Sequence, residues 1–319
     1  MITKKLFPLL TLILTVTSCH HKDLCFDHTH TLEVNVVFDW RNAPDADPAS
    51  MSAYFFNASG ETAPLRYIFT DRYGGHIDIS HGQYSALCMN ADDTDWAHLR
   101  NMSDIESSEI YTAETDELSV YGLSARSVPR AEGAEDERIV ATPGMLWADR
   151  QDSIAIPYTD SDDVRTITLY PEECVCHYTV DILDVENLKY VSGGSVDATV
   201  SGMSEGFLYG KRKTTDTRVT LPFTMKENSG KDALHGEFLT FGESQDHDYR
   251  HVLSVYMYLT DGSKWYYNFD VTDQIHNAPD PRHVHIVVSG LKLPHPISSG
   301  GGLIPEVDDW QTEKIDISM

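Results

Sequence analysis

The sequence predicts an all-β protein built from two tandem β-sandwiches. Three observations favour this fold. Short runs rich in β-branched and aromatic residues recur along the chain, turn signals separate them about every dozen residues, and no repeat of fixed period indicates a propeller or solenoid. The runs fall into two blocks of roughly seven strands each.

The N-terminus has the three parts of an export signal. Lys4 and Lys5 precede an apolar stretch over residues 6–16, and Ser18 and Cys19 follow it. The stretch is too short to span a bilayer as a helix. A cysteine directly after a small residue resembles a bacterial lipobox, so we expect cleavage before Cys19 and acylation of Cys19, which tethers the chain to a membrane. The alternative is an ordinary signal peptide with an incidental cysteine.

The first block is predicted over residues 31–163, after the signal peptide at 1–18 and a tether at 19–30. Its clearest strand covers residues 32–40. The runs Arg66 to Thr70 and His76 to Ile79 flank an Asp-Arg-Tyr-Gly-Gly turn, which predicts a hairpin. Residues from Asp95 to Arg100 are predicted to form one or two helical turns with Asp95 as the N-cap.

The second block is predicted over residues 164–293, after a short charged linker. Its clearest hairpin joins the runs 252–260 and 264–271 through Asp261-Gly262, a type I′ turn signal. Residues 294–319 read as a Pro/Gly/Ser linker and one terminal strand. Further strands are expected over residues 166–170, 175–185, 196–201, 218–223, 235–240 and 284–288.

The net charge limits the possible binding partners, and the cysteine content limits the possible disulfides. A net charge of −26 argues against nucleic acid and against lying flat on anionic lipid, since both require basic clusters. An exported protein can form disulfides, and the four remaining cysteines allow three pairings, with free thiols an equal alternative. Cys174 and Cys176 share one face of a predicted strand and are not expected to bond each other. The other two are Cys25 and Cys88.

One motif points to catalysis but lacks the surroundings that catalysis needs. Gly202-Met203-Ser204-Glu205-Gly206 matches the G-x-S-x-G nucleophile elbow. That elbow requires a helix after the strained turn, and the residues after Gly206 are β-prone. We therefore expect Ser204 to be structural and the protein not to be an enzyme, with no catalytic residues.

Potential metal ligands gather close to the predicted anchor. We interpret them as a solvated tether, because chain segments beside an anchor rarely hold a rigid ligand set. His283 and His285 repeat the spacing of His28 and His30. No metal and no cofactor are therefore predicted. The residues of the N-terminal cluster are His20, His21, Asp23, Cys25, Asp27, His28 and His30.

Several segments together resemble the fimbrillin superfamily of Bacteroidales lipoproteins, most closely the FimB/Mfa-type accessory and anchor subunits. The resemblance rests on the lipobox with Lys22-Asp23-Leu24-Cys25, the first strand Leu32 to Trp40, Gly82 to Leu87, Val200 to Gly206, and the tail Val307-Asp308-Asp309-Trp310. It implies two transthyretin-like β-sandwiches and a role in assembling or anchoring fimbriae.

The resemblance leads to a functional hypothesis. We expect a non-catalytic fimbrial accessory or anchor subunit in pilus assembly or cell adhesion, held in the outer membrane by lipid on Cys19, with pilin-type β-sandwich subunits as partners. A strand from such a partner can add to a sheet edge or groove. The alternative is a surface lipoprotein that binds glycans or other ligands. His20-His21-Lys22-Asp23 replaces the acidic residues usual in surface-displayed members, so the surface and periplasmic sides both stay open.

Overall fold

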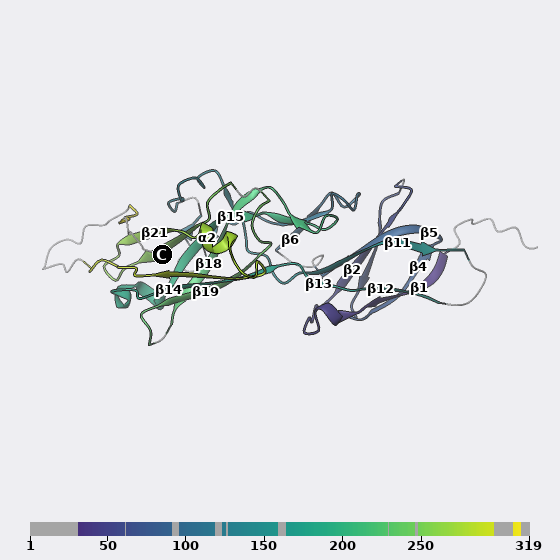
Figure 1. The fold of residues 1–319 in the computed structure, drawn as a ribbon, viewed down its shortest axis with the longest axis horizontal. Coiled ribbons are helices and arrows are strands. Elements are labelled where there is room, and N and C mark those ends of the chain that lie inside the picture. The colour runs from purple at the N-terminus through teal and green to yellow at the C-terminus, as the bar shows by residue number, and fades with distance from the viewer. Residues whose placement is uncertain are drawn as a thin grey trace, which may run out of the picture.

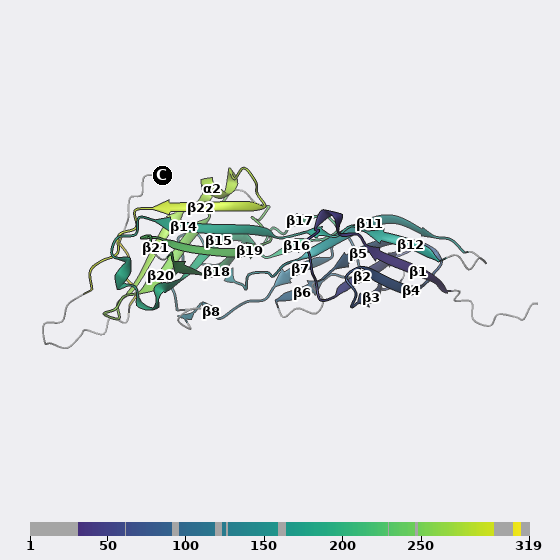
Figure 2. The ribbon, with the colours of Figure 1, turned by 90° about the horizontal axis from the view of Figure 1, so that it is seen from below.

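The computed structural model is elongated, with one lobe at each end (Figures 1 and 2). The first lobe contains the strands nearest the N-terminus, and the second contains most strands of the C-terminal half. Within the described residues no helix is long and apolar enough to cross a bilayer. The structure describes residues 31–60, 62–90, 96–118, 123–125, 127–158, 164–228, 230–245, 248–296 and 309–313.

Two separate sheets form the first lobe. The smaller sheet pairs, in order, β12 (Arg165–Leu169), β1 (Thr31–Phe38) and β4 (Gly74–Ser80). The larger sheet has the order β13 (Glu172–Glu173), β11 (Trp147–Ile156), β5 (Gly82–Met89), β2 (Met51–Asn57) and β3 (Leu65–Phe69). A short 3-10 turn, η1 (Trp40–Asn42), follows β1.

Alternation along β1 explains why it lies against a core. Val34, Val36 and Phe38 are almost fully buried, whereas the residues between them are partly exposed. Side chains at every second position of a strand point to one face, so these three side chains enter the space between the two sheets. There Phe38 meets Phe69 of the opposite sheet edge-on, with ring centroids 5.3 Å apart.

One continuous sheet forms the second lobe and folds over to enclose a single core. Its order is β21 (Lys264–Asp270), β20 (Val252–Tyr258), β15 (Ser195–Ser204), β18 (Arg218–Glu227), β19 (Leu234–Thr240), β14 (Cys176–Leu183) and β22 (His283–Ser289). Off this path, β10 (Arg138–Ile139) pairs in parallel with β18. The short helices are η2 (Leu188–Tyr190), η3 (Ser192–Gly194) and α2 (Thr272–His276).

A smaller sheet joins the two lobes. It has the order β17 (Lys213–Thr214), β16 (Gly206–Leu208), β7 (Glu109–Thr112) and β6 (Ala97–Arg100), and lies between the lobes in Figure 2. Its core packs Ile110 of β7 with Leu87 of the first lobe and Phe241, which follows β19 of the second. The remaining pair, β8 (Glu117–Leu118) and β9 (Leu123–Ser124), packs near Tyr256 of the second lobe.

The predicted all-β fold of sandwich units is confirmed, but the strands do not sort by the predicted domain boundary. β12 follows residue 163 yet pairs with β1 of the first lobe. Conversely, β7 and β10 precede that boundary yet pair with β16 and β18. The division into 31–163 and 164–293 stays a prediction. Strand pairing between residues distant in the sequence decides which lobe these segments join.

Two local predictions are wrong and one is confirmed. β3 and β4 follow each other but pair with β2 and β1 in different sheets, so the turn between them crosses the sandwich instead of closing a hairpin. Residues 97–100 form β6, not helical turns, because they complete a ladder with β7. β20 and β21 form the expected hairpin.

Candidate functional site

The β18–β19 ladder of the second lobe is incomplete. The strands pair only where Met225 to Glu227 face Leu234 to Gly236. At the other end, β10 occupies the same edge of β18 at Val219 and Thr220. Within the described residues, no strand forms a ladder with residues 221–223 on this edge. The two strands diverge here and leave a groove with a volume of about 870 Å³.

Two phenylalanine rings form the floor of the groove. Phe223 of β18 and Phe238 of β19 stack across the gap with ring centroids 4.5 Å apart, and each is 7% exposed. A Cβ on Gly236 would lie 3.0 Å from the Phe223 ring and 2.9 Å from Met225 Cγ. A glycine at this position therefore lets β19 approach β18 closely just where the ladder ends.

Main-chain groups and polar side chains form the walls. The carbonyl of Thr220 accepts a hydrogen bond from the Val140 amide on the groove side of β18. Because alternate residues of a strand direct their main-chain groups to the same edge, Pro222 also faces this side. A proline has no amide donor, so its place at this edge leaves no N–H unsatisfied. The other lining residues include Thr115, Thr142, Lys226, Glu227, Asn228, His235 and Glu237.

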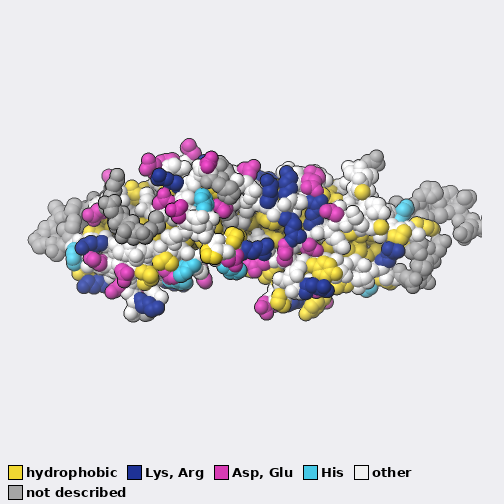
Figure 3. All heavy atoms as spheres, in the orientation of Figure 1, with side chains coloured by type: hydrophobic (Ala, Val, Ile, Leu, Met, Phe, Trp, Pro, Cys, Tyr) yellow, Lys and Arg dark blue, Asp and Glu magenta, His cyan; other side chains and the backbone are white. Residues whose placement is uncertain are grey.

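A buried carboxylate lies close to Ser204, where the sequence suggested chemistry. Glu205 is 2% exposed and forms ion pairs with both Arg100 and Arg138, and Arg100 also binds Glu109. On the face that Figure 3 draws, acidic and basic side chains are intermixed across the middle of the molecule. These pairs join the strands β6 and β10 to the turn after β15 and have a structural role.

Ser204 of the G-x-S-x-G motif is buried and hydrogen-bonded. It is 1% exposed within β15, and its hydroxyl lies 2.9 Å from the Gly206 carbonyl and 3.0 Å from Thr215 Oγ1. A nucleophile elbow presents its serine on a strained turn between a strand and a helix. Here the serine is buried in a sheet, and no histidine of the described residues is among its hydrogen-bond partners.

The described cysteines are free thiols. Cys88 is buried, and Cys174 and Cys176 are partly buried. Burial raises the pKa of Cys174 to about 12 and that of Cys176 to about 11, and it also raises the pKa of Cys88. Cys174 precedes β14 and is not on the strand with Cys176, contrary to prediction.

The histidines singled out in the sequence are only partly placed. Cys19, Cys25 and the histidines near the N-terminus lie outside the described residues. His283 stacks on His177 and bonds Asp280 at 2.9 Å, whereas His285 bonds Asp181 at 2.7 Å. These two histidines therefore sit in separate His–Asp pairs on the outer face of the second lobe.

Together the sheets define a class: an elongated, nearly all-β protein built from sandwich units. The chain belongs to the family described as "Domain of unknown function (DUF5119)", whose model matches residues 18–224. The crystal structure of a candidate adhesin from Bacteroides ovatus shares the fold, with a TM-score of 0.62 and 20% identity, over 88% of this chain and 99% of that chain. The resemblance to fimbrillin-type proteins is thus confirmed for the fold.

A weaker similarity links the chain to a named fimbrial protein. The fimbrial anchor protein Mfa2 from Porphyromonas gingivalis aligns with a TM-score of 0.48 and 12% identity, over 81% of this chain and 91% of that chain. A TM-score below 0.5 establishes neither fold nor function for this chain. No curated protein matches the sequence.

Proposed function

We propose that this protein is a non-catalytic fimbrial accessory or anchor subunit, held in the outer membrane by lipid on Cys19. Its groove between β18 and β19 accepts an extended segment of a pilin-type partner. The observation that carries the proposal is the incomplete ladder above the stacked phenylalanines. The lipobox and the fimbrillin-type fold support it.

The groove suits an extended chain. The segment of β18 that lies between the β10 pairing and the β19 ladder covers residues 221–223, and three residues in an extended strand span about 10 Å. An added strand forms main-chain hydrogen bonds along such an edge, and side-chain pockets provide specificity. The rim mixes Lys226 with Glu227 and Glu237, so it can pair with either charge on a partner.

Photo-crosslinking in the native envelope tests the proposal. A benzophenone amino acid replaces Glu237 on the rim, and a control protein carries it in place of Glu33, an exposed residue of β1 in the first lobe. We expect products with pilin-type subunits from position 237, in a ladder of sizes, and none from position 33. Mass spectrometry of the products identifies the partner.

The same experiment separates the alternative functions. Products with glycan-uptake proteins, or a position 237 product blocked by added glycan, would replace the fimbrial proposal with the glycan-binding one. Crosslinking of position 237 only to this chain's own C-terminal tail would show that the groove is filled within the molecule, and the strand-acceptor role would be rejected.

A further inference from the structure

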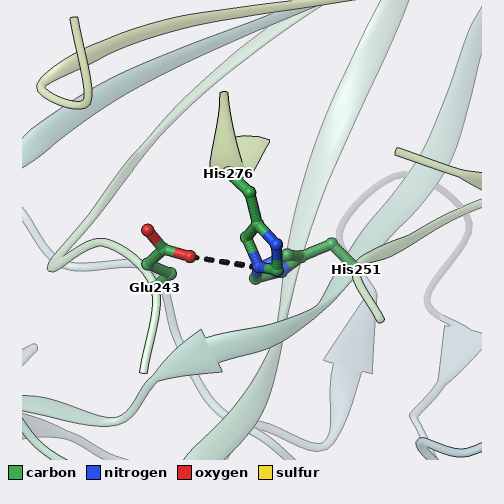
Figure 4. Close-up of side chains that lie close together, drawn as sticks. All are labelled: Glu243, His251 and His276. Atoms are coloured by element: carbon green, nitrogen blue, oxygen red, sulfur yellow. Dashed lines mark ion pairs between the residues drawn. The ribbon is translucent and has the colours of Figure 1, made fainter. Parts of the chain in front are cut away.

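Three side chains distant in sequence converge beside α2 at the edge of the second lobe. Glu243 comes from the loop between β19 and β20, His251 directly precedes β20, and His276 ends α2 (Figure 4). Glu243 Oε2 lies 3.2 Å from His276 Nε2 and 3.7 Å from His251 Nε2. The three ligand atoms all lie within 4.8 Å of one another.

The hydrogen bonding of His251 defines its tautomer. Its Nδ1 lies 3.0 Å from the Ser201 carbonyl, and because a carbonyl oxygen only accepts, Nδ1 carries the proton. In the neutral ring, Nε2 then directs a lone pair at Glu243. The side chain is fully buried, and Nε2 forms no hydrogen bond within the described structure. A buried lone pair that faces a carboxylate oxygen is unfavourable unless a metal ion or a proton lies between the two.

The surrounding backbone holds the histidines in place. The His251 amide donates to Thr272 Oγ1 at 2.9 Å, and the Val271 amide donates to the His251 carbonyl at 2.9 Å. The start of α2, which carries His276, is thereby tied to His251. The rings of the two histidines pack edge-on, with centroids 5.1 Å apart.

Gly202 provides the space below the His251 ring. It has φ +79°, and a Cβ there would lie 2.9 Å from His251 Nδ1 and 2.7 Å from the Tyr249 ring. Only glycine allows β15 to pass this close beneath the imidazole. A glycine of the G-x-S-x-G motif thus serves the packing of His251.

We propose that Glu243, His251 and His276 bind one zinc ion, with water as the fourth ligand. Two imidazole nitrogens and one carboxylate oxygen form a common zinc donor set, whereas calcium and magnesium prefer oxygen ligands. Tetrahedral ligands about 2.1 Å from zinc lie roughly 3.4 Å apart, close to the two distances to Glu243. The hydrogen bond from His251 Nδ1 to a backbone carbonyl is the usual support of a zinc-bound histidine.

The bound ion links three segments of the second lobe: the β19–β20 loop, the residue before β20, and α2. Glu243 and His276 have side chains 25% and 23% exposed, so water and the ion can reach the site. The ion holds the β19–β20 loop and α2 close to β15, whose Ser201 carbonyl accepts the hydrogen bond from His251. Zinc binding therefore stabilises the folded protein.

Titration of the full-length protein with zinc, after removal of metal by EDTA, tests this site. We expect the wild type to bind one equivalent more than the variants Glu243→Gln and His276→Ala, and we expect cobalt to give the visible absorption of a tetrahedral site. Affinity at this site falls by at least about tenfold in each variant. His285→Ala, which alters an exposed histidine bonded to Asp181, is the matched control and keeps the wild-type behaviour.

Comparing the variants excludes zinc bound elsewhere, including at the histidines near the N-terminus. Zinc should raise the melting temperature of the wild type and of His285→Ala but not of the two site variants. Circular dichroism without metal checks that all four proteins fold. Equal stoichiometry and equal melting shifts in all four would overturn the site. A wild type that binds no zinc would assign the cluster to an ion pair with a protonated histidine.

Discussion

The two lobes enclose their cores in different ways. The first lobe packs two separate sheets face to face, and the pocket at its seam between β11 and β12 has a volume of about 200 Å³. The second lobe folds one continuous sheet over itself, and the groove at its fold between β18 and β19 has a volume of about 870 Å³.

This difference shows where a sandwich can leave a groove on its surface. Strands twist relative to their neighbours, so a sheet that folds over must diverge along one ladder. In the second lobe that divergence occurs above Phe223 and Phe238, whose stacking replaces part of the ladder. In the first lobe both sheets end in edges, and no described ladder is forced open.

The largest expected effect comes from a matched pair of phenylalanines. Phe69 of the first lobe and Phe238 of the second are 6% and 7% exposed. Phe→Ala at either site should destabilise the protein by about 3–5 kcal/mol. We expect the smaller loss at Phe238, because its cavity opens into the groove and fills with water. Urea unfolding of both variants measures this, and a larger loss at Phe238 would show that the groove is closed.

The ion pairs of Glu205 should rank second. Glu205→Ala removes the shared partner of Arg100 and Arg138 and should destabilise the protein by about 3 kcal/mol. The loss is at the lower end for such pairs because both arginines are about 40% exposed and can be hydrated.

Glu114→Ala is the matched control for this network. Glu114 pairs with the same Arg138 but is 58% exposed, so its loss should stay below about 1 kcal/mol. Chemical denaturation of both variants compares them. Equal losses of stability in the two variants would mean that burial of Glu205 does not strengthen its ion pairs.

A third comparison concerns two strand glycines. Gly236→Ala places a methyl group 2.9–3.0 Å from Met225 and Phe223 and should destabilise the protein by about 1–3 kcal/mol. Gly75→Ala in β4 meets only the Phe69 ring at 3.4 Å and should change stability by less than about 1 kcal/mol. Thermal unfolding measures both, and similar melting temperatures would contradict a tight approach at Gly236.

The smallest expected effect is on the loss of folding stability at low pH. Partial burial raises the pKa of Asp181, but hydrogen bonds from His235 and His285 outweigh it, so its pKa lies below 3.8. Ionised Asp181 therefore stabilises the fold above about pH 4, and this contribution is lost as pH falls through the folded-state pKa. Unfolding at pH 6 and pH 3 should show a smaller acid loss for Asp181→Asn than for wild type. An unchanged loss would mean that the two histidines do not support the carboxylate.

Features that depend on neighbours in the chain could be predicted. The hairpin of β20 and β21 follows from two β-prone runs around Asp261-Gly262. The β-prone residues after Gly206 predicted a strand and not a helix, and β16 lies there. The same local reasoning failed for β3 and β4, because a turn signal does not reveal whether the chain stays in one sheet or crosses to the other.

The groove and the proposed zinc site were not predictable. Glu243, His251 and His276 have no spacing typical of a zinc motif. The histidines whose spacing suggested a metal site are those near the N-terminus and the pair His283 and His285. The only local hint of the groove is Pro222 within a β-prone run, since proline in a strand favours an open edge.

By itself the sequence determined an all-β fold of sandwich units, and it predicted an export signal and a lipid at Cys19, because composition, alternation and short motifs are local properties. Only the tertiary structure decided that β12 returns to pair with β1, that β18 and β19 part above two phenylalanines, and that two histidines meet Glu243. Each of these depends on which distant strands pair, and strand pairing is set by packing of the whole core.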